Sequence, residues 1–244
     1  MSTLGPPSFV DAWSSIMQES QMIDLTHPLE EQMPVWPLLP RYYHNLWSSL
    51  DYGDAYTAYQ LVMGEHTGTH ADAPAHYVSP GQPACISVDA MPLEAWCGPA
   101  AIISCHEVGP KGAVLPERVQ GWEQLHGAIR AGEFVIFDFG WSERWSIRPG
   151  DRAVLADWPG LDPTTAQLLV KRGVKGVGTD TLSPDVFGAP GDPVHHILLE
   201  RGIVVFENLA NLEVLPPRCY LMALPLPIRS GSGSPVRAVA MVHR

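Results

Sequence analysis

Three histidines and one aspartate lie close together in the first third of the chain. They are His66, His70, Asp72 and His76, within the eleven-residue segment HTGTHADAPAH. A buried imidazole or carboxylate needs a polar partner, so four such groups in one short segment are difficult to explain as packing. Binding of a metal ion would satisfy them together. Histidine and carboxylate ligands without thiolate suit zinc, and also manganese or iron where carboxylates share the coordination.

Small residues between these groups would allow them to crowd around one point. Gly68 and the neighbouring alanines let the backbone approach closely, and Pro74 restricts the chain before the last histidine. If residues 66–76 are extended, the even spacing of the four groups puts them on the same face. The segment therefore predicts one side of a strand or extended loop that carries metal ligands, for one ion or for two ions bridged by the aspartate.

A complete metal shell needs ligands from another part of the chain, which must fold to within coordinating reach of the aspartate. The next concentration of histidine and acid is His195 and His196, with Glu207 beyond them. Neighbouring residues of a helix point in different directions, so only one of these two histidines is expected to be a ligand. Glu65 and Glu213 are interpreted as solvated neighbours. The five isolated histidines are weaker candidates for metal ligands. His27 and His44 are better suited to the wall of a pocket. The other three are His106, His126 and His243.

Two acids are expected at the ends of strands in the second half of the chain. Residues 174–179 and 203–206 are apolar, follow helical segments that end at Arg-Gly, and lead to Asp180 and Glu207. In open α/β sheets, ligands bind outside the carboxyl ends of the strands. Asp180 has two open interpretations: a carboxylate that orients a ligand histidine, or a turn residue.

The apolar periodicity indicates a mixed α/β chain of short elements. Asp162 followed by proline predicts a helix start, and Gly173 predicts its end. Residues 56–63 alternate without a cleanly polar face, which suggests a strand buried on both sides. The other expected strands cover residues 22–25, 133–139, 219–224 and 236–242, and the other expected helices cover residues 8–18 and 119–130.

Composition is that of a globular protein. With 244 residues, 45% hydrophobic and 17% charged, the chain fits one domain over residues 1–244, with residues 1–20 as a helical extension. The net charge of −11, without a basic patch, argues against nucleic acid and acidic membrane surfaces as partners and leaves a small-molecule substrate. No secretory signal or membrane span is recognised, and the four cysteines form no CxxC pair. We therefore expect a cytoplasmic protein with free thiols.

The segment at residues 66–76 resembles the signature HxGTHxDxPxH of the cyclase-like metal-dependent hydrolases. This family includes bacterial kynurenine formamidase (arylformamidase) and isatin hydrolase, and HTGTHADAPAH meets every fixed position of the signature. The agreement extends over most of the chain, through the segments at residues 34–37, 176–181, 194–209 and 234–238.

The resemblance implies a set of metal ligands. His66, His70 and Asp72 would bind a divalent metal, zinc or manganese, with Asp72 able to bridge two ions. His195, which keeps the family's spacing to Glu207, would complete the shell of a second ion together with that glutamate. One or two ions per subunit are therefore expected.

The resemblance also implies an activity and a fold. Metal-activated water would cleave an amide, lactam or ester bond of a small cyclic or aromatic substrate, with His76 as general acid and base. Trp36 would line the substrate pocket, where its ring could stack on a planar substrate. The implied fold is a single α/β domain with a mixed, β-barrel-like sheet flanked by helices, of the swivelling β/β/α type. The implied assembly is a homodimer or a higher homo-oligomer.

Two departures from the family pattern bear on the substrate. Residues 38–40 read Leu-Leu-Pro where formamidases usually have Pro-Gly-Asp, and the aromatic-rich residues 41–55 are either a lid or a packing element. Two other functions remain open. One is a cyclase, lyase or dehydratase that uses the same metal to stabilise an enolate. The other is a non-catalytic metal-binding or scaffold protein, against which the presence of His76 argues.

Overall fold

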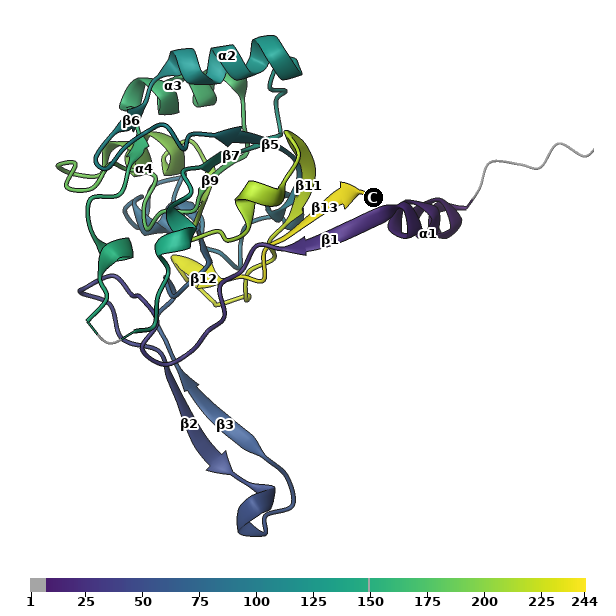
Figure 1. Ribbon diagram of the computed structural model, residues 1–244, viewed down its shortest axis with the longest axis vertical. Coiled ribbons are helices and arrows are strands. Elements are labelled where there is room, and N and C mark those ends of the chain that lie inside the picture. Colours follow the sequence, from purple (N-terminus) through teal and green to yellow (C-terminus); the bar gives the residue numbers. More distant parts are fainter. Residues whose placement is uncertain (1–7, 149) are drawn as a thin grey trace, which may run out of the picture.

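A curled, mixed sheet of nine strands forms the body of the protein (Figure 1). The computed structural model describes residues 8–148 and 150–244. The four central strands β5, β7, β9 and β10 run parallel, and the strands on both sides of them are antiparallel to their neighbours. In spatial order, the strands are β1 (Ser20–Asp24), β13 (Val239–His243), β11 (Arg218–Met222), β5 (Cys97–Ser104), β7 (Phe134–Asp138), β9 (Gly176–Thr179), β10 (Val204–Glu207), β4 (His70–Asp72) and β12 (Gly233–Pro235).

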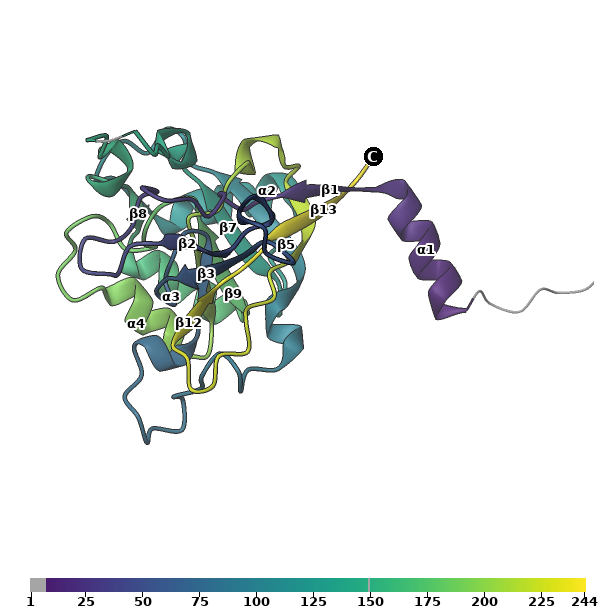
Figure 2. The same ribbon diagram turned by 90° about the horizontal axis from the view of Figure 1, so that it is seen from below.

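Three helices cover one face of this sheet, and a fourth projects from its edge (Figures 1 and 2). The covering helices are α2 (Pro116–His126), α3 (Pro163–Arg172) and α4 (Pro193–Leu199), and the projecting helix is α1 (Phe9–Glu19). The described residues thus form a single α/β domain with a half-barrel sheet and four helices, as expected. Two short pairs, β6 (Ala113–Val114) with β8 (Gly160–Leu161) and β2 with β3, lie outside the main sheet.

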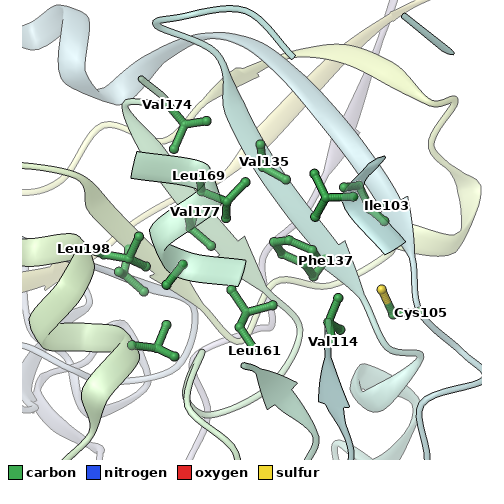
Figure 3. Packing of buried hydrophobic residues seen from close by; sticks show 14 of the residues in the cluster. Ile103, Cys105, Val114, Val135, Phe137, Leu161, Leu169, Val174, Val177 and Leu198 are labelled. Atoms are coloured by element: carbon green, nitrogen blue, oxygen red, sulfur yellow. The ribbon is translucent and has the colours of Figure 1, made fainter. Parts of the chain in front are cut away.

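Two apolar cores fill the two sides of the central strands. Val135 and Phe137 of β7 point toward α3, where they pack with Leu169 (Figure 3). The intervening residues, Phe134 and Ile136, point into the second core, which lies inside the curl of the sheet and collects side chains from both of its edges. Because both faces are covered, the central strands are largely apolar up to their last residues, as is usual for parallel strands.

The ends of the helices follow the sequence signals. The side chain of Asp162 accepts a hydrogen bond from the backbone N–H of Thr164 at the start of α3, and Gly173 ends the helix in the left-handed conformation at φ 69°. Ser8 accepts a hydrogen bond from the N–H of Asp11 and so caps α1. The predicted N-terminal helix is therefore present, although residues 1–7 of the predicted extension lie outside the described residues.

A two-stranded hairpin projects from the body on the side opposite to the helices (Figure 1). We call residues 43–62 the hairpin arm; its strands are β2 (Tyr43–Ser48) and β3 (Ala58–Val62). The expectation that residues 56–63 are buried on both sides is wrong, since β3 is largely exposed. The reason is that no other element among the described residues covers either face of the arm.

Two smaller expectations concern membranes and thiols. No helix within the described part of the chain is long and apolar enough to cross a membrane. All four cysteines are free thiols, as expected from their spacing.

Candidate metal centre

The signature segment folds back on itself instead of forming one extended face. Gly68 adopts a left-handed conformation at φ 63°, which turns the chain between His66 and β4. His70 and Asp72 lie on β4, and the chain then enters a short 3₁₀ helix, Pro74–His76. The expectation of one extended face is therefore wrong for the first and last histidines, because a turn on one side and the proline-initiated helix on the other bend them inward.

Residues that are distant in the sequence meet at Asp72. Glu207 ends β10 and is paired across the ladder with His70 of β4, and His195 comes from α4. The Nε2 atom of His70 lies 3.3 Å from Asp72 Oδ1 and 3.3 Å from Glu207 Oε2. The Nε2 atom of His195 lies 3.1 Å from Glu207 Oε1 and 3.5 Å from Asp72 Oδ2. All four side chains are buried.

His66 and His76 form a second group around Asp72. The Nδ1 atom of His66 lies 2.7 Å from Asp72 Oδ1, and the rings of His66 and His76 stack with their centroids 4.0 Å apart. Ligand atoms of His66, Asp72 and His76 lie within 4.8 Å of one another, and so do those of His70, Asp72 and Glu207. Asp72 thus belongs to both groups.

The charges of this cluster suit a cation. Burial favours the neutral acid, but His66 and His70 hold the pKa of Asp72 well below its ordinary value. Burial also opposes charge on His70, yet Asp72 and Glu207 raise the pKa of that imidazole to about 10. Asp72 Oδ2 is buried, and within residues 8–148 and 150–244 no hydrogen-bond partner for it is found. A site with two buried carboxylates and an unsatisfied oxygen is stabilised by a divalent ion, so the residues present fit a metal.

His66, His70 and His195 are each held by a contact at the ring nitrogen that does not face Asp72. This arrangement is typical of histidines that bind metal, because the outer contact sets which nitrogen presents its lone pair. The contacts are His70 Nδ1 to the carbonyl oxygen of Gly68 at 2.9 Å, His195 Nδ1 to Asp185 Oδ2 at 2.7 Å, and His66 Nε2 to Ser232 Oγ at 2.9 Å.

His76 differs from these three histidines. Its side chain is exposed to the cavity, and no side-chain hydrogen bond holds its ring within residues 8–148 and 150–244. Burial of part of the ring lowers its pKa below 6.5. A ring that is accessible and free to exchange a proton suits acid-base chemistry better than ligation.

A cavity of about 250 Å³ opens in front of this cluster. Trp36 stands in its wall, where the sequence resemblance places it, and its ring contacts that of Trp158 at 5.4 Å between centroids. Tyr77 and Asp192, which sequence reasoning did not single out, also line the cavity, and the Tyr77 hydroxyl donates to Asp192 Oδ2 at 2.9 Å. No described residue of the hairpin arm lines the cavity, so the arm is not a lid over the site of its own chain.

Of the two interpretations left open for Asp180, the structure agrees with the turn residue. The carboxylate of Asp180 accepts hydrogen bonds from the backbone N–H groups of Phe139, Trp141 and Ser142, so it holds the loop after β7, and among the described residues it makes no hydrogen bond to a clustered histidine. Asp185 orients His195 instead. Its two oxygens also accept hydrogen bonds from the backbone N–H groups at the start of α4. A single aspartate outside any motif, such as Asp185, gives no signal of this role in the sequence.

The remaining histidines lie outside the cluster. His196 points away from the site and contacts Glu200, as expected if only His195 faces the metal. His27 and His44 do not line the cavity: His27 stacks on Trp145, and His44 stacks on Tyr59 in the hairpin arm.

Comparison with known proteins identifies the family. The family model described as putative cyclase matches residues 23–186. The chain belongs to this cyclase family. Its sequence is 36% identical to kynurenine formamidase of Geobacillus thermodenitrificans, over 88% of this chain and 95% of the relative. It is 29% identical to isatin hydrolase of Roseibium aggregatum, over 93% of each chain.

The fold agrees with a solved cyclase-family structure. Isatin hydrolase A from Labrenzia aggregata, determined with benzyl benzoate bound, superposes with a TM-score of 0.88 at 33% identity, over 97% of this chain and 100% of that one. The resemblance inferred from the signature is therefore confirmed. The relatives are hydrolases that act on carbon–nitrogen bonds.

The pairing of His106 with Asp138 gives a pH-dependent prediction away from the metal cluster. Their side chains approach to 2.8 Å, and although burial opposes the charge, Asp138 raises the pKa of His106 above 6.5. The pair should therefore stabilise the fold below pH 6.5, and this contribution should disappear as the pH rises through the folded pKa. Titration of the His106 ring by NMR should give a pKa above 6.5, and Asp138→Asn should lower it. An unchanged value in Asp138→Asn would contradict this account.

Proposed function

We propose that this protein is a metal-dependent hydrolase that cleaves the carbon–nitrogen bond of a small cyclic or aromatic amide. The observation that carries the proposal is the buried, unpartnered oxygen of Asp72, surrounded by histidine and glutamate and open to a cavity beside His76. The relatives support the substrate class, because a formamidase acts on an open-chain amide and isatin is a cyclic amide.

The proposed metal is zinc or manganese, with one or two ions per subunit. His66, His70 and Asp72 would hold the first ion, since both histidines contact Asp72 Oδ1, and His195 and Glu207 would complete the site with Asp72 as the shared ligand. A bound divalent ion supplies an activated water and polarises the carbonyl group of the substrate. Histidine and carboxylate ligands suit both metals.

The side chains around the cavity have separate proposed tasks. His76 gives a proton to the leaving nitrogen, since its exposed ring is held by no side-chain hydrogen bond among the described residues. Trp36 presents an aromatic surface on which a planar substrate can stack. The apolar part of the wall, which includes Leu39 and Leu182, excludes bulk water from the substrate.

Replacement of His76 tests these roles. His76→Ala should keep its metal and lose turnover by about 10²- to 10⁴-fold, the usual contribution of general acid-base catalysis. His70→Ala should lose metal as well as activity, and His196→Ala, which faces away from the site, should retain both. Metal content by elemental analysis and turnover of isatin, N-formylkynurenine, simple lactams and lactones, with and without chelator, provide the measurements.

Three results would contradict the proposal in different ways. Wild-type protein purified without chelator that lacks stoichiometric metal would exclude a metal-dependent hydrolase. Loss of metal in His76→Ala would make this residue a ligand, as its place in the group with His66 and Asp72 allows. Chelator-sensitive elimination or cyclisation without hydrolysis would favour the lyase or cyclase alternative.

We also infer that the chain is one domain over residues 1–244, acts in the cytoplasm and forms a homodimer. The four free thiols suit a reducing compartment. The dimer is supported by the hairpin arm, in which Trp47 is 74% exposed and Tyr52 is 81% exposed. An isolated two-stranded hairpin is marginally stable in water, so its apolar faces need a covering layer.

The exposed area supports a second copy as that layer. The chain exposes 13031 Å², whereas a folded monomer of 26.7 kDa is expected to expose about 10,700 Å². The hairpin arm contributes to this excess, and so does the projecting helix α1, which has no buried residue. The arm carries no lysine or arginine and two acids, so two copies that each carry −11 can meet there with little repulsion.

Light scattering can test the dimer. Wild-type protein should show about twice the mass of 26.7 kDa, and a double variant with Trp47→Ser and Tyr52→Ser should dissociate. Leu125→Ser is the matched control, because Leu125 is 81% exposed but lies on α2, far from the arm (Figure 1). A wild-type monomer at tens of micromolar, or a double variant with unchanged mass, would contradict the assignment of the arm.

A further inference from the structure

A line of polar contacts continues from His66 away from the cavity. The Nε2 atom of His66 lies 2.9 Å from Ser232 Oγ, and this hydroxyl donates to Glu65 Oε2 at 2.7 Å. The backbone N–H of Ser232 donates to the same carboxylate oxygen at 2.9 Å. The interpretation of Glu65 as a solvated neighbour is therefore wrong, because its carboxylate accepts two hydrogen bonds from Ser232. Glu65 joins the signature segment to a loop that lies 167 positions later in the chain.

The hydrogen-bonding capacity of these groups determines the direction of the contacts. A carboxylate can only accept, so the single hydroxyl proton of Ser232 is directed to Glu65. The Ser232 oxygen then accepts from His66, which requires a proton on Nε2. The Nδ1 atom of His66 lies 2.7 Å from Asp72 Oδ1, and this carboxylate also can only accept, so without metal Nδ1 donates to it. A cation beside the aspartate would take the place of the Nδ1 proton, while the proton on Nε2 stays with Ser232.

The loop approaches His66 closely because glycines flank the serine. A Cβ atom on Gly233 would lie 2.6 Å from Cε1 of His66 and 2.7 Å from the carbonyl oxygen of Ala71, both too close to be accommodated. Gly233 is also paired with Asp72 across the β12–β4 ladder. The sheet register therefore places the hydroxyl of Ser232 and the carboxylate of Asp72 on opposite nitrogens of the same imidazole.

We propose that Glu65 and Ser232 are a positioning pair that fixes the tautomer and the orientation of His66 and thereby strengthens metal binding through Nδ1. This role extends the proposed function and depends on it, because it takes His66 to be a metal ligand. His195 receives the equivalent support from the carboxylate of Asp185 directly, whereas His66 receives it through a hydroxyl. Contacts of this outer kind typically change metal affinity by 10- to 100-fold.

A purely structural role for Glu65 makes a different prediction. If the carboxylate only ties the loop to the signature segment, the backbone N–H of Ser232 is sufficient and the hydroxyl is dispensable. Ser232→Ala keeps this backbone contact and removes the hydroxyl, so it separates the two roles. Ser232→Thr restores a hydroxyl and serves as the rescue. Ser230→Ala is the matched control in the same loop, because no side-chain hydrogen bond of Ser230 is found within the described residues.

The first measurement is the dissociation constant of Mn²⁺ and of Zn²⁺, obtained by chelator competition on the full chain. We expect Ser232→Ala to bind either metal about 10- to 100-fold more weakly than wild type. Glu65→Gln, which keeps an acceptor but removes the charge, should weaken binding less than Ser232→Ala. Ser232→Thr should recover most of the affinity, and Ser230→Ala should match wild type. Equal affinities in wild type and Ser232→Ala, with wild-type unfolding temperatures, would overturn the proposal.

The second measurement works without metal. Long-range proton–nitrogen NMR spectra of the metal-free protein should show a proton on Nε2 of His66, and Ser232→Ala should shift that nitrogen resonance. An Nε2 atom without a proton would reverse the direction of the contacts and overturn the positioning pair, whether or not metal binds. A wild-type protein that binds neither metal but shows the Nε2 proton would refute the proposed function and the metal-directed role together, and would leave Glu65 and Ser232 as a structural contact.

Discussion

The structure depends on a carboxylate placed where water cannot reach it. Asp72 is 1% exposed, and such a group is stable only if positive or hydrogen-bonding partners surround it. His66, His70 and His195 converge on it, and Glu207 adds a second buried acid that contacts His70 and His195. Each of these histidines must in turn be held by an acceptor of its own. The chemistry of the site follows from this one concentration of negative charge.

The curled sheet is what allows this concentration. β4 is only three residues long, but it lies between β10 and β12, so one neighbour delivers Glu207 and the other brings the loop with Ser232. Because β9 and β10 are parallel, the chain between them must cross back over the sheet, and α4 in this connection places His195 near the strand ends. The histidine that is left accessible, His76, comes from the short helix that follows β4.

Residue types and local capping signals were predictable from the sequence, whereas long-range contacts and layers were not. The signature gave the clustered histidines and the family, and Asp162 with Gly173 gave the limits of α3. No strand was assigned to β5, whose Gly98-Pro99 start interrupts the pattern although it is central to the sheet. Asp185 and Ser232 carry no spacing signal, because tertiary contacts alone bring them to their histidines. The hairpin arm was misjudged because alternation cannot show whether a covering layer exists.

The central claim is that the groups around Asp72 bind a divalent ion. The most direct measurement is anomalous diffraction from crystals grown with Mn²⁺ or Zn²⁺, recorded on both sides of the absorption edge of the metal. The account predicts an anomalous peak within about 2.0–2.3 Å of ligand atoms of His70 and Asp72, the usual range for zinc with nitrogen or oxygen ligands and close to that for manganese. Crystals containing the metal that show no peak at Asp72, or a peak only elsewhere, would contradict it.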